Sequence, residues 1–213
     1  MLIRRDVHVW FGLFLCASVA GASLAQAAEL PEHSSSAASL PADHFLTHFQ
    51  QIDLIDQAGQ AFQPDRLTGR VLLVSFIYTR CASVCSLQTR VLAEVLQALP
   101  PDVRDQVRFV SLSLDPAYDR PQQLQQFAAT QGADQPGWWF LTGDTAQIQQ
   151  LTHRLRLFDE STPEQPAQLP LHRTSLWLVD AQGRMLQRYR GDPPDQERLV
   201  RELTQVSRMR DAL

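Results

Sequence analysis

The chain has 213 residues and a formal net charge of −4, and hydrophobic residues make up 44% of it. This length predicts one globular domain with short accessory segments, and an acidic chain without a basic run disfavours nucleic acid as a ligand. All 19 cationic side chains are arginine. The sequence therefore excludes mechanisms that need a lysine, such as Schiff-base formation and phosphate binding by a P-loop.

Residues 1–27 contain the parts of a secretory signal peptide. Arg4 and Arg5 form a short basic region, a mostly apolar stretch follows over residues 7–24, and Ala25-Gln26-Ala27 fits a small-residue cleavage site. The alternative is an uncleaved membrane anchor, because the apolar stretch nearly reaches the ~20 residues that span a bilayer. Both interpretations predict export, so we expect the folded part in the periplasm or otherwise outside the cytoplasm, either soluble or tethered to the membrane by its N-terminus.

Residues 28–44 are polar and rich in small side chains, which predicts a flexible tether. We expect the histidines in and near this segment to be solvated rather than to bind a ligand; they are His33, His44 and His48. The compact domain is then expected over residues 45–213.

The first half of the domain begins with two short strands and continues with a buried strand and a helix. An N-terminal β-hairpin is predicted over residues 52–62. Residues 71–78 are almost continuously apolar, which is typical of a central strand buried on both faces. Apolar residues then recur at helical spacing from Leu87 to Leu99, and Pro100-Pro101 ends that helix.

The second half repeats the alternation of strands and helices. A buried strand is predicted at 107–114, a helix from Pro121 to Gly132, a short strand at 138–141, and a helix capped by Asp144. A proline-containing loop at 158–171 precedes two strands, 175–179 and 185–189, and a last helix follows Pro193-Pro194. This order predicts an α/β sandwich of thioredoxin type with an extra N-terminal β-hairpin.

Cys81 and Cys85 are the two cysteines expected in the mature domain, because Cys16 lies within the signal. A disulfide between them would close a loop of only five residues, which constrains an unfolded chain much less than a long loop does. Their spacing therefore favours redox or metal chemistry, and a pair of buried thiols or an inert disulfide is the structural alternative.

The position of this pair favours a reactive thiolate. Cys81 and Cys85 stand at i and i+4 at or near a helix start, which predicts Cβ atoms about 5–6 Å apart on one face. This separation is close to that of a disulfide and lets two thiolates converge on a soft ion such as Cu(I). The N-terminus of the helix and the adjacent Arg80 both favour the charged form of a thiol.

Two sulfurs leave a metal ion under-coordinated, so a third ligand is required. His172 stands between the proline-containing loop and the strand at 175–179, a junction that lies opposite the cysteine-bearing helix start in a thioredoxin-like fold. From the residues alone, a ligand and a hydrogen-bonded loop histidine are equally supported. His153 is expected on an amphipathic helix, where it packs or meets solvent.

Several segments together resemble the Sco/SenC family of copper chaperones. The segment at 76–85 (Phe-Ile-Tyr-Thr-Arg-Cys-Ala-Ser-Val-Cys) and the segment at 111–116 (Ser-Leu-Ser-Leu-Asp-Pro), with Asp119 and Pro121, are similar to those of the family. Leu141-Thr142-Gly143 and His172, followed by residues 177–184, extend the resemblance over most of residues 45–205.

The resemblance implies a copper-binding metallochaperone that serves assembly of the CuA centre of cytochrome c oxidase. It implies Cys81, Cys85 and His172 as ligands of Cu(I) or Cu(II), and at most a supporting role for Asp115 outside the ligand shell. A cytochrome c oxidase subunit or a copper-donor protein is the implied partner.

Three neighbours of the implied ligands depart from the family pattern. Ala82 and Ser86 follow the cysteines where the family commonly has proline, and Leu171 precedes the histidine where an aspartate is common. These changes keep the ligands and bear on affinity, reduction potential and partner choice. Two other functions stay open: a thiol-disulfide oxidoreductase that acts on exported partners through the cysteine pair, and a thiol peroxidase.

Overall fold

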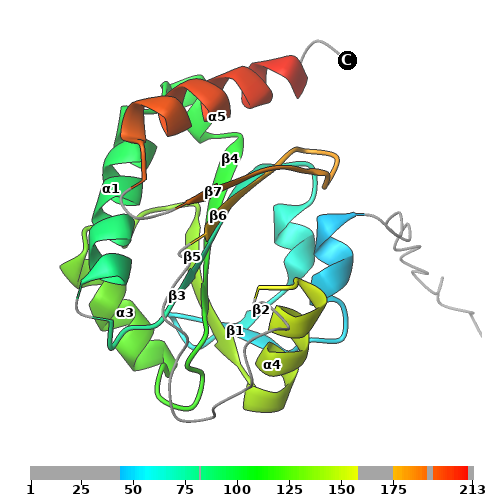
Figure 1. Cartoon of the computed structure of the whole chain (residues 1–213), viewed down its shortest axis with the longest axis vertical. Coiled ribbons are helices and arrows are strands. Elements are labelled where there is room, and N and C mark those ends of the chain that lie inside the picture. The colour runs from blue at the N-terminus through cyan, green and yellow to red at the C-terminus, as the bar shows by residue number, and fades with distance from the viewer. Residues whose placement is uncertain (1–43, 82, 158–174, 191–193, 211–213) are drawn as a thin grey trace, which may run out of the picture. The chain divides into compact units, whose positions relative to one another are not determined.

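The computed structural model describes residues 44–81, 83–157, 175–190 and 194–210. The predicted signal peptide, the predicted tether up to residue 43, and the predicted loop at 158–171 lie outside the described residues. Within them, seven strands form one sheet in the order β2-β1-β5-β4-β3-β6-β7 (Figure 1). The strands are β1 (Leu54–Asp56), β2 (Ala61–Phe62), β3 (Val71–Ile77), β4 (Val107–Ser113), β5 (Trp138–Gly143), β6 (Ser175–Val179) and β7 (Met185–Arg190).

The centre of the sheet is parallel and its two sides are antiparallel. β3 and β4 run parallel with Ile77 beside Ser113, so the loops that follow the two strands leave from the same edge. β6 runs antiparallel to β3, with Leu176 beside Ser75, so β6 begins at this edge as well. The carboxyl ends of β3 and β4 and the start of β6 are therefore close together.

β3 is buried along its whole length, as its apolar sequence predicts. Successive side chains of a strand point to opposite faces. Val71, Leu73 and Ile77 enter one hydrophobic cluster, and the even-numbered side chains between them enter a second cluster on the other face. This two-sided burial fixes the strand from which the cysteine segment leaves.

Helices cover both faces of the sheet (Figure 1). The first cluster is closed by α1 (Val84–Ala98), α2 (Pro101–Arg104), α3 (Pro121–Thr130) and α5 (Gln196–Arg210). The second is closed by η1 (Phe45–Phe49), η2 (Pro64–Leu67) and α4 (Thr145–Arg154). The result is a three-layer α/β sandwich, as predicted.

One local prediction is confirmed by side-chain contacts, and a neighbouring pair of tryptophans shows how β5 is packed. Asp144 caps α4, because its side chain accepts hydrogen bonds from the backbone N–H groups of Ala146 and Gln147. The paired tryptophans divide between core and rim: Trp138 is 2% exposed, and Trp139 is half-buried beside Phe62.

The expectation that His44 is solvated is wrong. His44 is buried, and its Nδ1 accepts a hydrogen bond from Leu46 N–H at the start of η1. The imidazole packs on the turn between β6 and β7, where a Cβ on Gly183 would lie 2.2 Å from His44 Nε2. Gly183 also has φ +77°, so glycine suits this turn for both its space and its backbone conformation.

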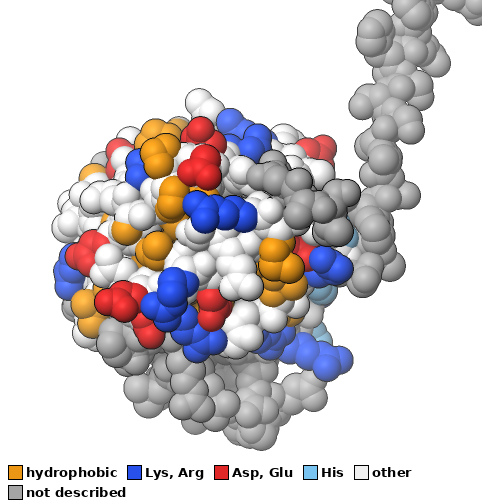
Figure 2. Space-filling model, turned by 90° about the horizontal axis from the view of Figure 1, so that it is seen from above, with side chains coloured by type: hydrophobic (Ala, Val, Ile, Leu, Met, Phe, Trp, Pro, Cys, Tyr) orange, Lys and Arg blue, Asp and Glu red, His pale blue; other side chains and the backbone are white. Residues whose placement is uncertain are grey.

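The surface of the described residues carries mixed charge. On the face in Figure 2, arginines and acidic side chains are interspersed with small apolar areas. Among the described helices, none combines the length and hydropathy that crossing a membrane requires.

Candidate metal centre

The first cysteine lies in the turn that joins β3 to α1, ahead of the helix itself. Cys81 N–H donates to the carbonyl of Tyr78 at 3.1 Å, and α1 begins at Val84. The sequence placed both cysteines at or near the helix start; only Cys85 is within the helix. The two cysteines are therefore connected by a turn and the first residues of α1, and not by one continuous helical segment.

The sulfur of Cys81 takes the place of a helix-capping oxygen. The backbone N–H of Cys85 donates to Cys81 Sγ at 3.4 Å, while Ser83, which immediately precedes the helix, makes no side-chain capping bond. Burial raises the pKa of Cys81, but hydrogen bonds from the backbone and thiol of Cys85, from Ser83 N–H and from the Tyr78 hydroxyl outweigh it and lower the pKa below its ordinary value. The first turn of α1 therefore stabilises a thiolate at Cys81.

Cys85 has the opposite character. It is 1% exposed, and burial raises its pKa to about 12 despite a hydrogen bond from Tyr78 N–H. The thiols of Cys81 and Cys85 also contact each other. Tyr78 touches both sulfurs, and burial together with the charge of Cys81 raises the pKa of its phenol to about 12. The pair combines one activated sulfur with one sulfur that stays protonated while no metal is bound.

We expect iodoacetamide to modify Cys81 well before Cys85 in the reduced, metal-free protein. The rate should rise with pH through the lowered pKa of Cys81, because the thiolate is the nucleophile. Both cysteines lie on one tryptic peptide between Arg80 and Arg90, so fragment-ion mass spectrometry assigns the label. Denatured protein is the control and should label at both positions; equal labelling in the folded protein would contradict the asymmetry.

Arg80 forms an ion pair with Asp115. Its Nε and Nη2 donate to Asp115 Oδ2 at 2.9 and 2.5 Å, and its guanidinium lies 4.7 Å from the centre of the Tyr118 ring. From the sequence, the charge of the adjacent Arg80 was expected to favour the thiolate. In the structure, Asp115 binds Arg80, and the hydrogen bonds that favour the Cys81 thiolate come from the backbone N–H groups of Ser83 and Cys85, the Cys85 thiol and the Tyr78 hydroxyl.

A second carboxylate near the pair was not identified as a functional residue from the sequence. Asp119 is fully buried and accepts hydrogen bonds from Thr79 and Ser113. A signal for it exists in the sequence, because an acidic residue follows closely after a buried strand whose end meets the cysteine segment. This signal alone does not identify Asp119, because only the register of β3 and β4 shows that the ends of the two strands meet.

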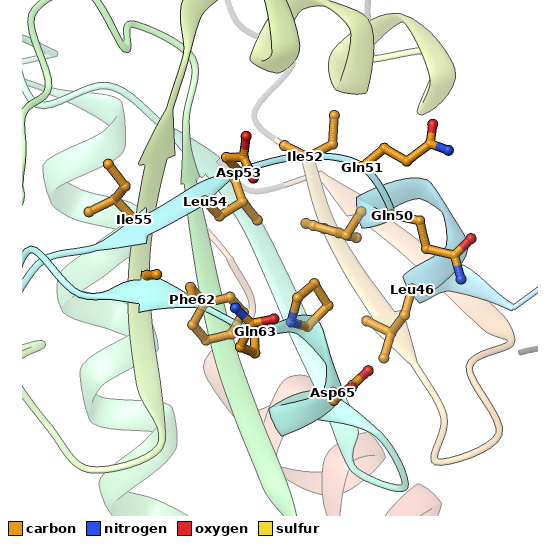
Figure 3. A pocket seen from close by; sticks show the side chains of 13 residues that line it. Leu46, Gln50, Gln51, Ile52, Asp53, Leu54, Ile55, Phe62, Gln63 and Asp65 are labelled. Carbon is orange, nitrogen blue, oxygen red and sulfur yellow. The ribbon is translucent and has the colours of Figure 1, made fainter. Parts of the chain in front are cut away.

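A cavity of about 380 Å³ lies at a different place in the fold, among η1, β1, β2 and η2 (Figure 3). Its polar lining consists of amides and carboxylates, from Gln50, Gln51, Asp53, Gln63 and Asp65, and it contains no cysteine or histidine. β1 and β2 form one edge of the sheet, whereas Cys81 follows the central strand. The cavity and the thiol pair are therefore separate features.

The described residues supply two soft ligands in one place. No group of three histidine, cysteine or acidic side chains able to hold a metal ion occurs among them; His172, the predicted third ligand, lies outside them. His153 is exposed on α4, as expected. Two adjacent cysteine sulfurs, one of them activated, suit a soft ion such as Cu(I), so the donor set present fits copper and needs one further ligand.

The fold and the thiol pair define a class: a thioredoxin-like domain with a Cys-x-x-x-Cys segment after its central strand. The family model SCO1/SenC matches residues 37–208. The chain belongs to the SCO1/SenC family.

Relatives of known name or structure agree with this assignment. The SCO1 protein homolog of Bacillus subtilis is 32% identical over 137 residues, which cover 64% of this chain and 70% of the relative. The copper-bound structure of ScoI from Bradyrhizobium japonicum has a TM-score of 0.60 at 26% identity, over 73% of this chain and 96% of that one. BsSco, described with a disulfide switch and as a member of the Sco family of cytochrome c oxidase assembly proteins, has a TM-score of 0.59 at 27% identity, over 73% and 90%.

Proposed function

We propose that this chain is an exported copper chaperone that carries copper to the CuA centre of cytochrome c oxidase, with Cys81, Cys85 and His172 as the copper ligands. The observation that carries the proposal is the contact between the thiol of Cys81, in the turn before α1, and the thiol of Cys85, in the first turn of α1. Thiolates suit Cu(I), and an added imidazole lets one site serve both oxidation states. Copper is here a cargo to be delivered.

The sheet register supports His172 as the third ligand. β6 begins at Ser175, beside the carboxyl end of β3 from which the cysteine turn leaves. His172 precedes Ser175 by three residues, a span of at most about 10 Å. A histidine so close in the chain to that edge is well suited to close a site begun by Cys81 and Cys85.

Copper titration of His172→Ala tests the ligand set. We expect the reduced wild-type protein to bind one copper ion per chain under anaerobic conditions. His172→Ala should weaken binding at least about tenfold, since even an outer-shell partner of a metal ligand is worth about that much, and should change the Cu(II) absorption spectrum. His153→Ala, on the exposed side of α4, is the control. Unchanged affinity and spectrum in His172→Ala would remove this histidine from the ligands.

The export and partner parts of the proposal rest on other evidence. The signal-like residues 1–27 support a periplasmic location, free or held at the membrane by the N-terminus. The family assignment and the description of BsSco as a member of an oxidase-assembly family support an oxidase subunit or a copper donor as the partner.

A thiol-disulfide oxidoreductase is the second candidate, favoured by the contact between the two thiols. Cys81 would attack a partner disulfide to form a mixed disulfide and release one partner thiolate. Cys85 would lose its proton and attack Cys81 Sγ, which releases the second partner thiolate and leaves the Cys81–Cys85 disulfide. Reduction of an oxidised CuA-site peptide by the metal-free protein would support this role. If the peptide is not reduced, the oxidoreductase role is rejected and metal delivery stays as the proposed function.

A further inference from the structure

Asp119 holds the cysteine segment from a neighbouring loop. It lies between β4 and α3, where its backbone N–H donates to the Asp115 carbonyl at 2.8 Å. Its Oδ1 accepts from Thr79 Oγ1 at 2.5 Å, and its Oδ2 accepts from Thr79 N–H at 3.1 Å and from Ser113 Oγ at 2.6 Å. The carboxylate thus bridges the ends of two parallel strands that lie side by side (Figure 1).

The carboxylate of this bridge is buried and has no ion-pair partner among the described residues. Asp119 is 0% exposed, and the nearby Arg80 is bound to Asp115. A carboxylate removed from water costs free energy unless hydrogen bonds replace its hydration, so the donors of Thr79 and Ser113 are needed to keep Asp119 in place. Conversely, Asp119 restricts where Thr79 can lie.

Thr79 is joined directly to the residue that contacts both sulfurs. Tyr78 donates its backbone N–H to Cys85 and its hydroxyl to Cys81, and its carbonyl accepts from Cys81 N–H. A shift of Thr79 therefore moves Tyr78 and, with it, contacts to both cysteines. The chain of contacts runs from Asp119 through Thr79 and Tyr78 to the thiol pair.

We propose that Asp119 is a positioning residue that fixes the relative placement of Cys81 and Cys85, and so sets both how readily the pair closes to a disulfide and how tightly it holds copper. The copper part of this inference rests on the proposed function; the disulfide part does not. Asp119 positions the pair through Thr79 and Tyr78 and hydrogen-bonds to neither sulfur in the contacts described, although its charge also contributes to the raised pKa of Cys85.

The test measures the dithiol–disulfide equilibrium of the metal-free protein in glutathione buffers. Cys81 and Cys85 together lose two electrons and two protons to one glutathione disulfide, which becomes two glutathione molecules. We expect Asp119→Asn, which replaces one acceptor oxygen by an amide donor, to shift the equilibrium constant about tenfold, equal to about 30 mV for this two-electron couple. Thr79→Val, which lacks the hydroxyl, should shift it in the same direction, and Thr79→Ser should stay within about twofold of wild type, since its hydroxyl preserves the bond.

Asp180→Asn is the control, although Asp180, unlike Asp119, also has an ion-pair partner, Arg184. Asp180 is also a buried carboxylate in a loop, where it accepts from the backbone N–H groups of Gln182 and Arg184. It follows β6 at the end of β3 remote from the cysteines, because Val179 pairs with Leu72. Asp180→Asn should lower stability without moving the dithiol–disulfide equilibrium, which separates positioning from a general loosening of the fold.

The outcomes separate this inference from the proposed function. A folded Asp119→Asn variant with the wild-type equilibrium constant would overturn the inference, whatever copper does. If Asp119→Asn does not fold, Thr79→Val decides: a wild-type constant in Thr79→Val overturns the inference, and a shift restored in Thr79→Ser supports it. Wild-type protein that binds no copper while Asp119→Asn shifts the equilibrium would end the copper proposal and leave the positioning role standing.

Discussion

Replacing Cys85 with serine should abolish tight copper binding. A four-ligand site of thiolates and imidazoles is worth about 10–16 kcal/mol in small zinc domains, so one such ligand corresponds to about 2.5–4 kcal/mol, or a loss of affinity of about 60-fold to 700-fold. A serine hydroxyl stays protonated and is a hard ligand, which suits a soft ion poorly. Competition with a Cu(I) chelator measures the change.

Cys85→Ala is the companion to this substitution, because it also removes the sulfur but adds no hydroxyl to the buried site. The two variants should lose copper equally if the sulfur is the ligand. Cys85 is almost completely buried, so near-ultraviolet circular dichroism must first show that each variant keeps its tertiary packing. Wild-type copper affinity in either folded variant would contradict a two-sulfur site.

Truncation of Trp138 to alanine should destabilise the fold by about 3–5 kcal/mol, which is a large part of the 5–15 kcal/mol typical of a domain. The Trp138 ring lies 5.1 Å from Phe109 and 5.3 Å from Phe140, measured between ring centroids. Its Nε1–H donates to Ser111 Oγ, which is paired with Ser75 Oγ. The variant therefore creates a cavity and removes the Trp138 donor from the buried Ser111 hydroxyl. Urea unfolding under reducing conditions measures the loss.

Trp139 is the matched control, since it is the same side chain on the next residue of β5. It is half-buried and packs against Phe62 and Arg66 on the other face of the strand. Trp139→Ala should cost about 1–2 kcal/mol, consistent with an ordinary partly exposed position. Equal losses of unfolding free energy in the two variants would contradict the expectation that Trp138 contributes more to the core than Trp139.

Features set by local pattern were predicted from the sequence. The continuous apolar run of β3 predicted burial on both faces, and the helical spacing of apolar residues after Cys85 predicted α1. Both predictions succeeded because strand and helix periodicities are properties of short segments. The Cys81–Cys85 pair at the strand-to-helix junction followed from the same two elements. Both cysteines do lie there, and the family assignment agrees with the resemblance of the motifs.

Features set by distant pairing were not predicted. His44 is buried because the turn at Gly183 packs on it, and nothing local to the N-terminal segment reveals that contact. The ion pair between Arg80 and Asp115 was not foreseen either, because the register of β3 and β4 brings Asp115 to Arg80. The positioning contacts of Asp119 depend on the same register. Each miss is a side-chain contact between segments that are close only after the sheet forms.

The order of strands in the sheet also governs when the thiols become protected. Leu54 pairs with Gly143, and Leu72 in the central strand pairs with Val179, so strands from the two ends of the domain must meet before the sheet is complete. Folds dominated by such non-local pairings fold slowly, because the entropy of closing long loops is lost before the contacts form. Cys81 and Cys85, which the finished domain buries, are accessible in the chain during that interval. An oxidant that meets the newly made chain therefore reaches both sulfurs before tertiary structure covers Cys85 almost completely and Cys81 in large part. The redox state of the pair can therefore be set during folding.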